Sequence, residues 1–163
     1  SNVRALMERG WSGVCVEPGL VFPELWKQTR EFADRVQCVN AAIVPPRQDG
    51  LIEFFEPPTG GCVSTLDQKH RTKWEPAAGA MQPFWTNTLS IQTLFQQFGP
   101  AEFINLDVEG KNWELFVCLP FTWSQLRLIC VEFDSHLTEM TAHALRYGFH
   151  RIHSTGENLL LAR

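Results

Sequence analysis

Short apolar runs alternate along this chain with segments whose apolar residues recur at helical spacing. Residues 14–16 and 128–131 are such runs, and residues 91–98 carry apolar side chains at positions i, i+3, i+4 and i+7. Continuous apolar runs of this length are typical of strands buried on both faces of a parallel sheet. The helical spacing is typical of an amphipathic helix. The alternation predicts an α/β fold with a mostly parallel sheet and helices on both of its faces.

The same two patterns, with glycine and proline as end signals, place the remaining elements. We expect further helices over residues 3–9, 23–33, 110–119 and 137–147, and further strands over residues 36–43, 51–55 and 103–107. Two short runs on either side of residues 156–158 predict a C-terminal β-hairpin, which adds an antiparallel edge to the sheet.

The segment from Pro57 to Thr88 contains proline, glycine, tryptophan and charge but little periodicity. A span of this length without secondary structure is uncommon inside a compact domain and is often a lid or a binding loop. The sequence therefore predicts a long loop over residues 57–88, either a cover for the substrate or a disordered surface loop. Its basic and aromatic side chains are Lys69, His70, Arg71, Lys73, Trp74 and Trp85.

Length and charge restrict the classes to which the chain can belong. Its 163 residues suffice for a sizeable core, so we expect a single domain over residues 1–163. The formal net charge of −4 argues against a broad phosphate-attracting surface, and we expect no nucleic-acid partner. No apolar run approaches the ~20 residues that span a bilayer, and charges stand where a signal peptide needs apolar residues. We therefore expect a cytoplasmic protein without a membrane partner.

The five cysteines form no C-x-x-C pair, and three of them lie inside apolar runs. Free cysteine packs in such runs as a small hydrophobic residue. The sequence thus predicts reduced thiols rather than a disulfide framework or a zinc site.

Acidic residues stand at the ends of three predicted strands. They are Glu17, Asp107 with Glu109, and Glu132. In open α/β sheets, ligands bind beyond the carboxyl ends of the strands. A single acid of this kind is as well explained by a solvent-exposed strand end as by a ligand site. Three at neighbouring ends favour a site, because crowded carboxylates repel one another unless a cationic ligand or a metal compensates them.

Five motifs occur in order along the chain: RGWSGVCVEP at residues 9–18, CVNAAI at 38–43, IEFFE at 52–56, DVEG at 107–110 and GENLLLAR at 156–163. Together they resemble the FkbM family of S-adenosylmethionine-dependent methyltransferases, and the resemblance runs over residues 1–163. DVEG before a helix is its most specific part. The resemblance implies a Rossmann-like fold, the cofactor S-adenosylmethionine, and methyl transfer to a hydroxyl on a sugar, a lipid or a secondary metabolite.

The resemblance also implies which residues bind the cofactor. Glu17, with Pro18 beside it, would bind the hydroxyls of the ribose. Asn40 and Ala41 would border the adenine, and Asp107 would lie near the sulfonium. Taken alone, Asn40 is also consistent with an amide that caps a loop.

Asp107 and Glu109 are the candidate catalytic residues. They lie at i and i+2, so they share one face if the strand continues past residue 107. By the resemblance they lie beside the incoming hydroxyl, and a carboxylate within hydrogen-bond reach can take its proton. Glu109 also suits the N-terminus of a helix that follows Gly110. Glu132 is a weaker member of the group, and the resemblance requires no metal.

In the family, a first strand and a glycine-rich loop would precede Ser1, and no Gly-x-Gly pattern occurs in this sequence. We therefore expect the chain to be truncated at its N-terminus relative to the family. The absent strand lies centrally in the family's sheet, between the strand that ends at Glu17 and the strand that ends at Asp107. We expect an unpaired edge between these two strands, with both acids opening onto one cleft.

Two other functions stay open. A nicotinamide-dependent oxidoreductase could also use Glu17 on a ribose, but it leaves DVEG at residues 107–110 unexplained. A non-catalytic Rossmann-like domain that serves as an interaction module would carry similar motifs without binding S-adenosylmethionine. For the methyltransferase we expect a small hydroxyl-bearing substrate, and the sequence predicts no particular oligomeric state.

Overall fold

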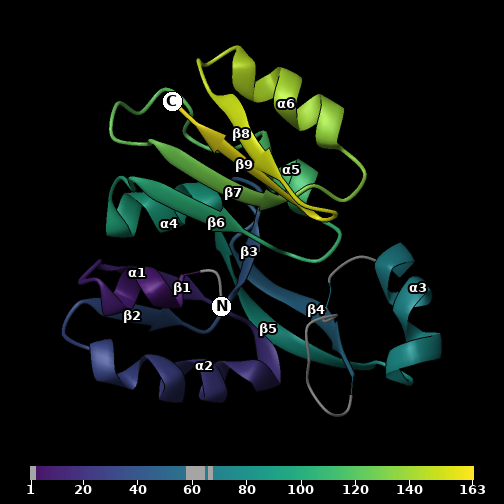
Figure 1. Ribbon diagram of the computed structural model, residues 1–163. Coiled ribbons are helices and arrows are strands. Elements are labelled where there is room, and N and C mark those ends of the chain that lie inside the picture. The colour runs from purple at the N-terminus through teal and green to yellow at the C-terminus, as the bar shows by residue number, and fades with distance from the viewer. Residues whose placement is uncertain (1–2, 58–64, 66–67) are drawn as a thin grey trace.

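The computed structural model describes residues 3–57, 65 and 68–163, which form three small sheets flanked by helices (Figure 1). In chain order the elements are α1 (Arg4–Glu8), β1 (Gly13–Val16), α2 (Phe22–Thr29), β2 (Val36–Val39), β3 (Ala42–Val44), β4 (Gly50–Glu56), α3 (Gln68–Ala78), β5 (Gln82–Ser90), α4 (Ile91–Phe98), β6 (Phe103–Leu106), α5 (Asn112–Phe116), β7 (Leu128–Glu132), α6 (Leu137–Leu145), β8 (His150–Ser154) and β9 (Asn158–Ala162). Short 3-10 helices, Gly19–Val21 and Arg30–Phe32, flank α2.

The first sheet is the parallel pair of β1 and β2. Helix α2 packs against β2, and Met7 of α1 is buried in a small cluster with Phe32 and Val36. Gly10 follows α1 with a φ of 89°, a conformation that favours glycine. The helix therefore ends where the sequence predicts.

The second sheet has the order β3-β5-β4. β4 runs antiparallel to β5 along its whole length, whereas β3 runs parallel to β5 and pairs only with Thr88–Ser90. Ser90 then caps α4, because its hydroxyl oxygen accepts the backbone N–H of Thr93 at 3.1 Å. This cap fixes the point at which β5 becomes α4.

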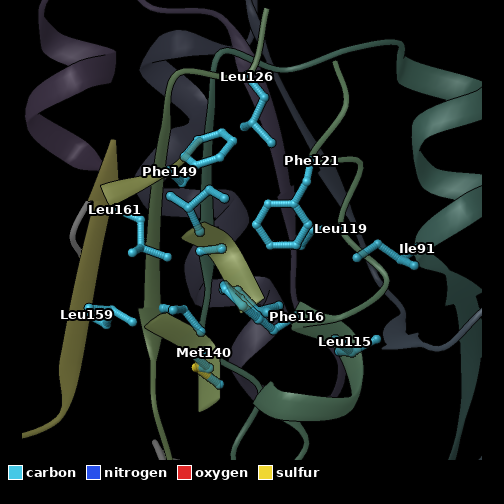
Figure 2. Close-up of a cluster of buried hydrophobic side chains, with 14 residues drawn as sticks. Ile91, Leu115, Phe116, Leu119, Phe121, Leu126, Met140, Phe149, Leu159 and Leu161 are labelled. Atoms are coloured by element: carbon cyan, nitrogen blue, oxygen red, sulfur yellow. The ribbon is translucent and has the colours of Figure 1, made fainter. Parts of the chain in front are cut away.

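The largest core lies on one face of the third sheet, which has the order β6-β7-β9-β8. Helices α5 and α6 cover this face, and Figure 2 shows Phe116 and Met140 from these helices beside Leu159 and Leu161 of β9. All four side chains are fully buried. Along β7 and β9, buried residues alternate with half-exposed ones, so the opposite face is only partly covered.

The α/β class is confirmed, and so is the C-terminal hairpin of β8 and β9, but the expected mostly parallel arrangement fits only in part. Three strand pairs are parallel (β1–β2, β3–β5 and β6–β7) and three are antiparallel (β4–β5, β7–β9 and β8–β9) among the described residues. The apolar run at 128–131 is not buried on both sides. Its alternation of buried and half-exposed residues is the pattern of a sheet covered on one face.

The strand expected over residues 36–43 is two strands in different sheets. β2 ends at Val39, β3 begins at Ala42, and Asn40 and Ala41 carry the chain from one sheet to the other. Apolar residues predominate in both strands, so the sequence pattern does not reveal the change of sheet.

The long loop expected over residues 57–88 is wrong for the described part of that segment, which contains α3 and most of β5. The sequence pattern hides β5 because Thr86 and Thr88 take its buried side, while Trp85 is exposed. Their polarity therefore runs against the alternation that marks a half-buried strand. Residues 58–64, 66 and 67 lie outside the described residues, as do the side chains of Lys69 and His70.

The longest helix in the described part of the chain is α3, with 11 residues. None of the described helices combines the length and the apolar character needed to cross a membrane.

Four cysteines are free thiols, as expected: Cys15, Cys38, Cys118 and Cys130. Cys62 lies outside the described residues. Cys15 lies opposite Cys38 on the paired strands β1 and β2. Burial, and to a smaller extent Cys38, raises the pKa of Cys15 to about 11. This thiol therefore stays protonated and unreactive at neutral pH.

The expected unpaired edge between β1 and β6 is confirmed. Among the described residues, β1 pairs only with β2, and β6 pairs only with β7. The β1–β2 sheet lies below β6 in Figure 1, as a separate unit. Each of these two strands therefore has one edge without a partner strand.

Candidate functional site

Four acidic residues stand at the ends of strands from all three sheets. Glu17 directly follows β1, Asp107 directly follows β6, Glu56 ends β4 and Glu132 ends β7. The charge of Asp107 acts on both Glu17 and Glu132, and that of Glu56 acts on Glu17, so each of the four carboxylates interacts electrostatically with at least one other. The strand-end acids predicted from the sequence are thus brought together, and Glu56 joins them. A cleft lined by both Glu17 and Asp107 stays a prediction.

Glu109 joins two of these acids, because one carboxylate oxygen each of Asp107, Glu109 and Glu132 lies within 4.8 Å of the others. Strand alternation is not the reason for their proximity. β6 ends at Leu106, and Glu109 has a left-handed backbone with a φ of 44°. A turn brings Glu109 back, and the hydroxyl of Thr65 donates to its carbonyl oxygen at 2.7 Å. Three carboxylate oxygens at this spacing suit a hard divalent cation such as Mg²⁺ or Ca²⁺.

Asn112 ties these acids to the main chain from a fully buried position. Its side-chain oxygen accepts the backbone N–H of Val108 at 3.0 Å. Its side-chain nitrogen donates to Glu132 at 3.1 Å and to Asp134 at 2.8 Å. One amide thus holds the turn after β6 and the end of β7 in a fixed relation.

Burial and mutual repulsion raise the pKa of the clustered acids. Burial, followed by the charges of Glu132, Asp107 and Asp134, raises the pKa of Glu109 to about 8, and Lys73 opposes this shift. Burial, followed by the charges of Asp107 and Asp134, raises the pKa of Glu132 to about 7. At neutral pH Glu109 is therefore mostly protonated. Both carboxyl groups lie in the range that suits proton transfer near neutral pH.

Glu17, at the end of β1, is likewise partly buried among other acidic residues. Burial, followed by the charges of Glu56 and Asp107, raises the pKa of Glu17 to about 7. Glu56 is only 2% exposed. Gly19 packs directly against it with a φ of 81°, and a Cβ atom at Gly19 would lie 2.7 Å from a Glu56 carboxylate oxygen. Only glycine fits here without displacing the acid.

The residues expected at the adenine differ in their accessibility. Asn40 directly follows β2, is exposed, and lines a pocket of about 350 Å³ together with Gly19. Ala41, directly before β3, is only 4% exposed, so its side chain offers little surface to a ligand. Pro18 is half-buried beside Glu17.

Sequence reasoning misses Glu56, Asn112 and Asp134. A signal exists for Glu56, since strand alternation places it on the same side of β4 as the buried Phe54. Asn112 and Asp134 have no comparable signal. Their roles depend on how the start of α5 packs against the end of β7, which no short-range pattern encodes.

Strained backbone is concentrated at this site. Glu109, Asp134 and Ser135 have φ values of 44°, 42° and 76°, and Arg47 is the other described non-glycine residue with a positive φ. A non-glycine residue in this region costs about 1–3 kcal/mol, and such residues cluster at functional sites. Three of them beside the acid cluster are consistent with a ligand site that the surrounding hydrogen bonds hold in place.

The raised pKa values predict that the ligand-free protein loses thermal stability as the pH rises from 6.5 to 8. Glu17, Glu109 and Glu132 hold protons in the folded state that the unfolded chain releases near pH 4.3. Their stabilising contribution is complete below that pH and is lost through pH 7 to 8. Burial lowers the pKa of His143, which reduces stability only below about pH 6.5.

Melting temperatures at pH 6.5, 7, 7.5 and 8 would test this prediction. Glu109→Gln removes one of the titrating groups, so its melting temperature is expected to fall less over the same range. A melting temperature that rises from pH 6.5 to 8 in the wild type would contradict it.

Comparisons of the chain with protein-family models, with curated proteins and with solved structures find no match. The assignment of the site therefore depends on the geometry and the charges of the residues themselves.

Proposed function

We propose that this chain is a Rossmann-like, S-adenosylmethionine-dependent methyltransferase that methylates a hydroxyl on a sugar, a lipid or a secondary metabolite. The observation that carries the proposal is that the charge of Asp107, directly after β6, acts on Glu17, directly after β1, while these two strands do not pair with each other among the described residues. In doubly wound sheets, cofactors bind beyond the carboxyl ends of the strands at such a point.

The charge of the group supports a cationic ligand. Glu17, Glu56, Asp107, Glu109 and Glu132 are crowded together, and burial and repulsion hold three of them partly or mostly protonated near pH 7. A sulfonium bound among them would favour their charged forms and remove part of the repulsion. S-adenosylmethionine carries such a charge close to its ribose. The ribose hydroxyls would donate hydrogen bonds to the Glu17 carboxylate.

The same charges argue against the nicotinamide alternative. A nicotinamide dinucleotide carries two phosphates, which the carboxylates would repel. Lys73 is the basic residue that acts on Glu109 in the described part of the chain, and it is outnumbered by Glu132, Asp107 and Asp134.

In methyl transfer, the main task of the protein is to position the methyl donor and the acceptor hydroxyl. Methyl transfer from a sulfonium to an oxygen is an in-line displacement, in which the acceptor oxygen forms a bond to the methyl carbon as the carbon–sulfur bond breaks. Most of the acceleration comes from holding donor and acceptor in near-attack geometry. Glu109 or Asp107 would accept the hydroxyl proton as the new bond forms.

Calorimetric titration of the full-length protein with S-adenosylhomocysteine tests the proposal. We expect saturable one-to-one binding and a rise in melting temperature with ligand concentration, since the ligand binds only the folded state. A protein that binds neither S-adenosylhomocysteine nor S-adenosylmethionine would overturn the proposal and leave the non-catalytic alternative.

Glu17→Ala is expected to weaken S-adenosylhomocysteine binding by about tenfold or more. The ribose would lose hydrogen bonds to a charged acceptor, which are worth about 1.5–3 kcal/mol. The dissociation constant from calorimetry measures the effect. Glu139→Ala, at an exposed position on α6, serves as the control and should leave the constant unchanged. An unchanged constant for a folded Glu17→Ala variant would refute the ribose assignment.

A further inference from the structure

Helix α3, which stands at the outer edge of the molecule in Figure 1, is connected to the acid cluster by three successive contacts. The Arg71 guanidinium of α3 lies over the Phe55 ring of β4, 4.4 Å from its centroid. Phe55 exchanges two backbone hydrogen bonds with Thr65, both at 2.9 Å. The Thr65 hydroxyl donates to the Glu109 carbonyl oxygen at 2.7 Å. The first half of α3 is therefore tied to the turn that carries Glu109.

Lys73, two residues after Arg71 on α3, is a cation that this arrangement brings near Glu109. Its charge acts on Glu109 in opposition to the charges of the surrounding acids. Lys73 is exposed, and its ammonium nitrogen lies 4.8 Å from the centroid of the Trp74 ring. Among the described residues it has no ion-pair partner, whereas Arg71 is paired with Glu75 at 2.7 Å. The Lys73 ammonium therefore has donors available for an anion.

The position of Lys73 corresponds to the methyl acceptor rather than to the methyl donor. In the proposed reaction Glu109 takes the proton of the acceptor hydroxyl, so the acceptor lies against Glu109. The ribose of the donor is assigned to Glu17, and the charges that act on Glu17 are those of Glu56 and Asp107. A group close to the acceptor hydroxyl is therefore the part of the two substrates that comes near Lys73.

We propose that Lys73 binds an anionic group of the methyl acceptor, so that the substrate is a hydroxyl compound that also carries a carboxylate or a phosphate. The inference rests on the proposed function and narrows its substrate class. An anion at the acid cluster would be repelled by Asp107 and Glu132 unless a cation compensated it. The Lys73 ammonium supplies a positive charge and three donors at this point, from which a neutral acceptor would gain little.

This assignment is compatible with the argument against a nicotinamide dinucleotide. The two phosphates of a dinucleotide would follow the ribose at Glu17, where the acting charges are the acids Glu56 and Asp107. The anion of the acceptor lies instead on the side of Glu109, where Lys73 acts. The same chain can therefore disfavour phosphates on its cofactor and favour one anionic group on its acceptor.

Methylation of acceptor pairs that differ in one anionic group tests the proposal on the full-length protein. The free pairs are glucuronate against glucose and glycerol 3-phosphate against glycerol. The lipid pair is phosphatidylglycerol against diacylglycerol, both in phosphatidylcholine vesicles, so the panel also distinguishes a free acceptor from a lipid headgroup. Formation of S-adenosylhomocysteine measures kcat/KM for each member. We expect the anionic member of at least one pair to be preferred by about three- to tenfold, the gain from one partly exposed charge contact.

Lys73→Gln should remove most of this preference, and Lys73→Arg should keep it because the positive charge remains. The ratio of kcat/KM within a pair is the readout, since any effect of Lys73 on Glu109 applies to both members and cancels. Lys27→Gln is the matched control, because the Lys27 side chain is 77% exposed on α2. It should keep the wild-type ratio, and melting temperatures verify that each variant is folded.

The outcomes separate this inference from the proposed function. If the wild type binds S-adenosylhomocysteine but prefers no anionic acceptor, or if a folded Lys73→Gln variant keeps the wild-type ratio, the assignment of Lys73 is overturned and the methyltransferase proposal stands. If Lys73→Gln weakens S-adenosylhomocysteine binding tenfold or more, Lys73 binds the donor and the acceptor assignment is again overturned. If the wild type binds neither S-adenosylhomocysteine nor S-adenosylmethionine, both proposals fail.

Discussion

Replacing Glu109 with glutamine is expected to lower methyl-transfer turnover by about two to four orders of magnitude, the range for loss of a positioned general base. Glutamine has the shape of the protonated glutamate but cannot accept a proton. Because the pKa of Glu109 is raised to about 8, the wild-type residue is mostly neutral at pH 7, and the affinity for S-adenosylhomocysteine should change little. Turnover of the wild type should rise with pH up to about 8, and Glu109→Gln should lose this rise.

Formation of S-adenosylhomocysteine, with a hydroxyl acceptor identified by screening, measures turnover in this experiment. Asp107→Asn tests the second candidate base in the same way, and Glu139→Gln on the exposed side of α6 is the control. If Glu109→Gln and Asp107→Asn both keep wild-type turnover, neither carboxylate is the base. Positioning alone would then account for catalysis.

The affinity for S-adenosylmethionine is expected to rise with pH more steeply than the affinity for S-adenosylhomocysteine. The two molecules differ at the sulfur, which is a charged sulfonium in the first and a neutral sulfide in the second. Both ligands carry the ribose that Glu17 would bind, and the pKa of Glu17 is raised to about 7. Only the sulfonium also needs ionised carboxylates at Glu132 and Glu109, whose pKa values are raised to about 7 and 8. If one group with a pKa near 8 must lose its proton, affinity falls by about tenfold for each pH unit below 8.

The ratio of the two dissociation constants should therefore change by up to about a hundredfold between pH 6 and pH 8. Calorimetry in buffers of different ionisation enthalpy would also count the protons released on binding. A larger proton release with S-adenosylmethionine than with S-adenosylhomocysteine is the expected result. Parallel pH dependence for the two ligands would mean that the acid cluster does not contact the sulfonium.

The sequence predicts an element correctly where its apolar residues are the buried ones and its polar residues are the exposed ones. The helix over residues 91–98 is an example, because its apolar stripe packs on a single core and Gly99 ends it with a φ of 81°. β5 fails the same analysis, because Thr86 and Thr88 are buried and Trp85 is exposed. Its environment is set by pairing with β4 and by the adjoining pocket, neither of which is local in sequence.

Some residues of the candidate site can be predicted from local sequence and others cannot. Glu17, Asp107 and Glu132 are predictable because an acid directly after an apolar strand has a known place at the edge of a sheet. The proximity of Glu109 is predicted for the wrong reason, since a turn rather than a continued strand brings it to Asp107. The contribution of Asn112 arises only when α5 meets the end of β7, so it is absent from any local pattern.

The left-handed backbone at Glu109, Asp134 and Ser135 limits how far the thermal stability of this chain can be raised without loss of activity. Glycine or asparagine would relieve the strain at each position, and at the first two it would also remove a carboxyl group from the crowded acids. A library selected for heat resistance alone would therefore accumulate changes here first and lose the carboxylates with the strain. At Glu109, thermal tolerance and activity are therefore set in opposite directions by one residue, so selection on this scaffold has to measure both.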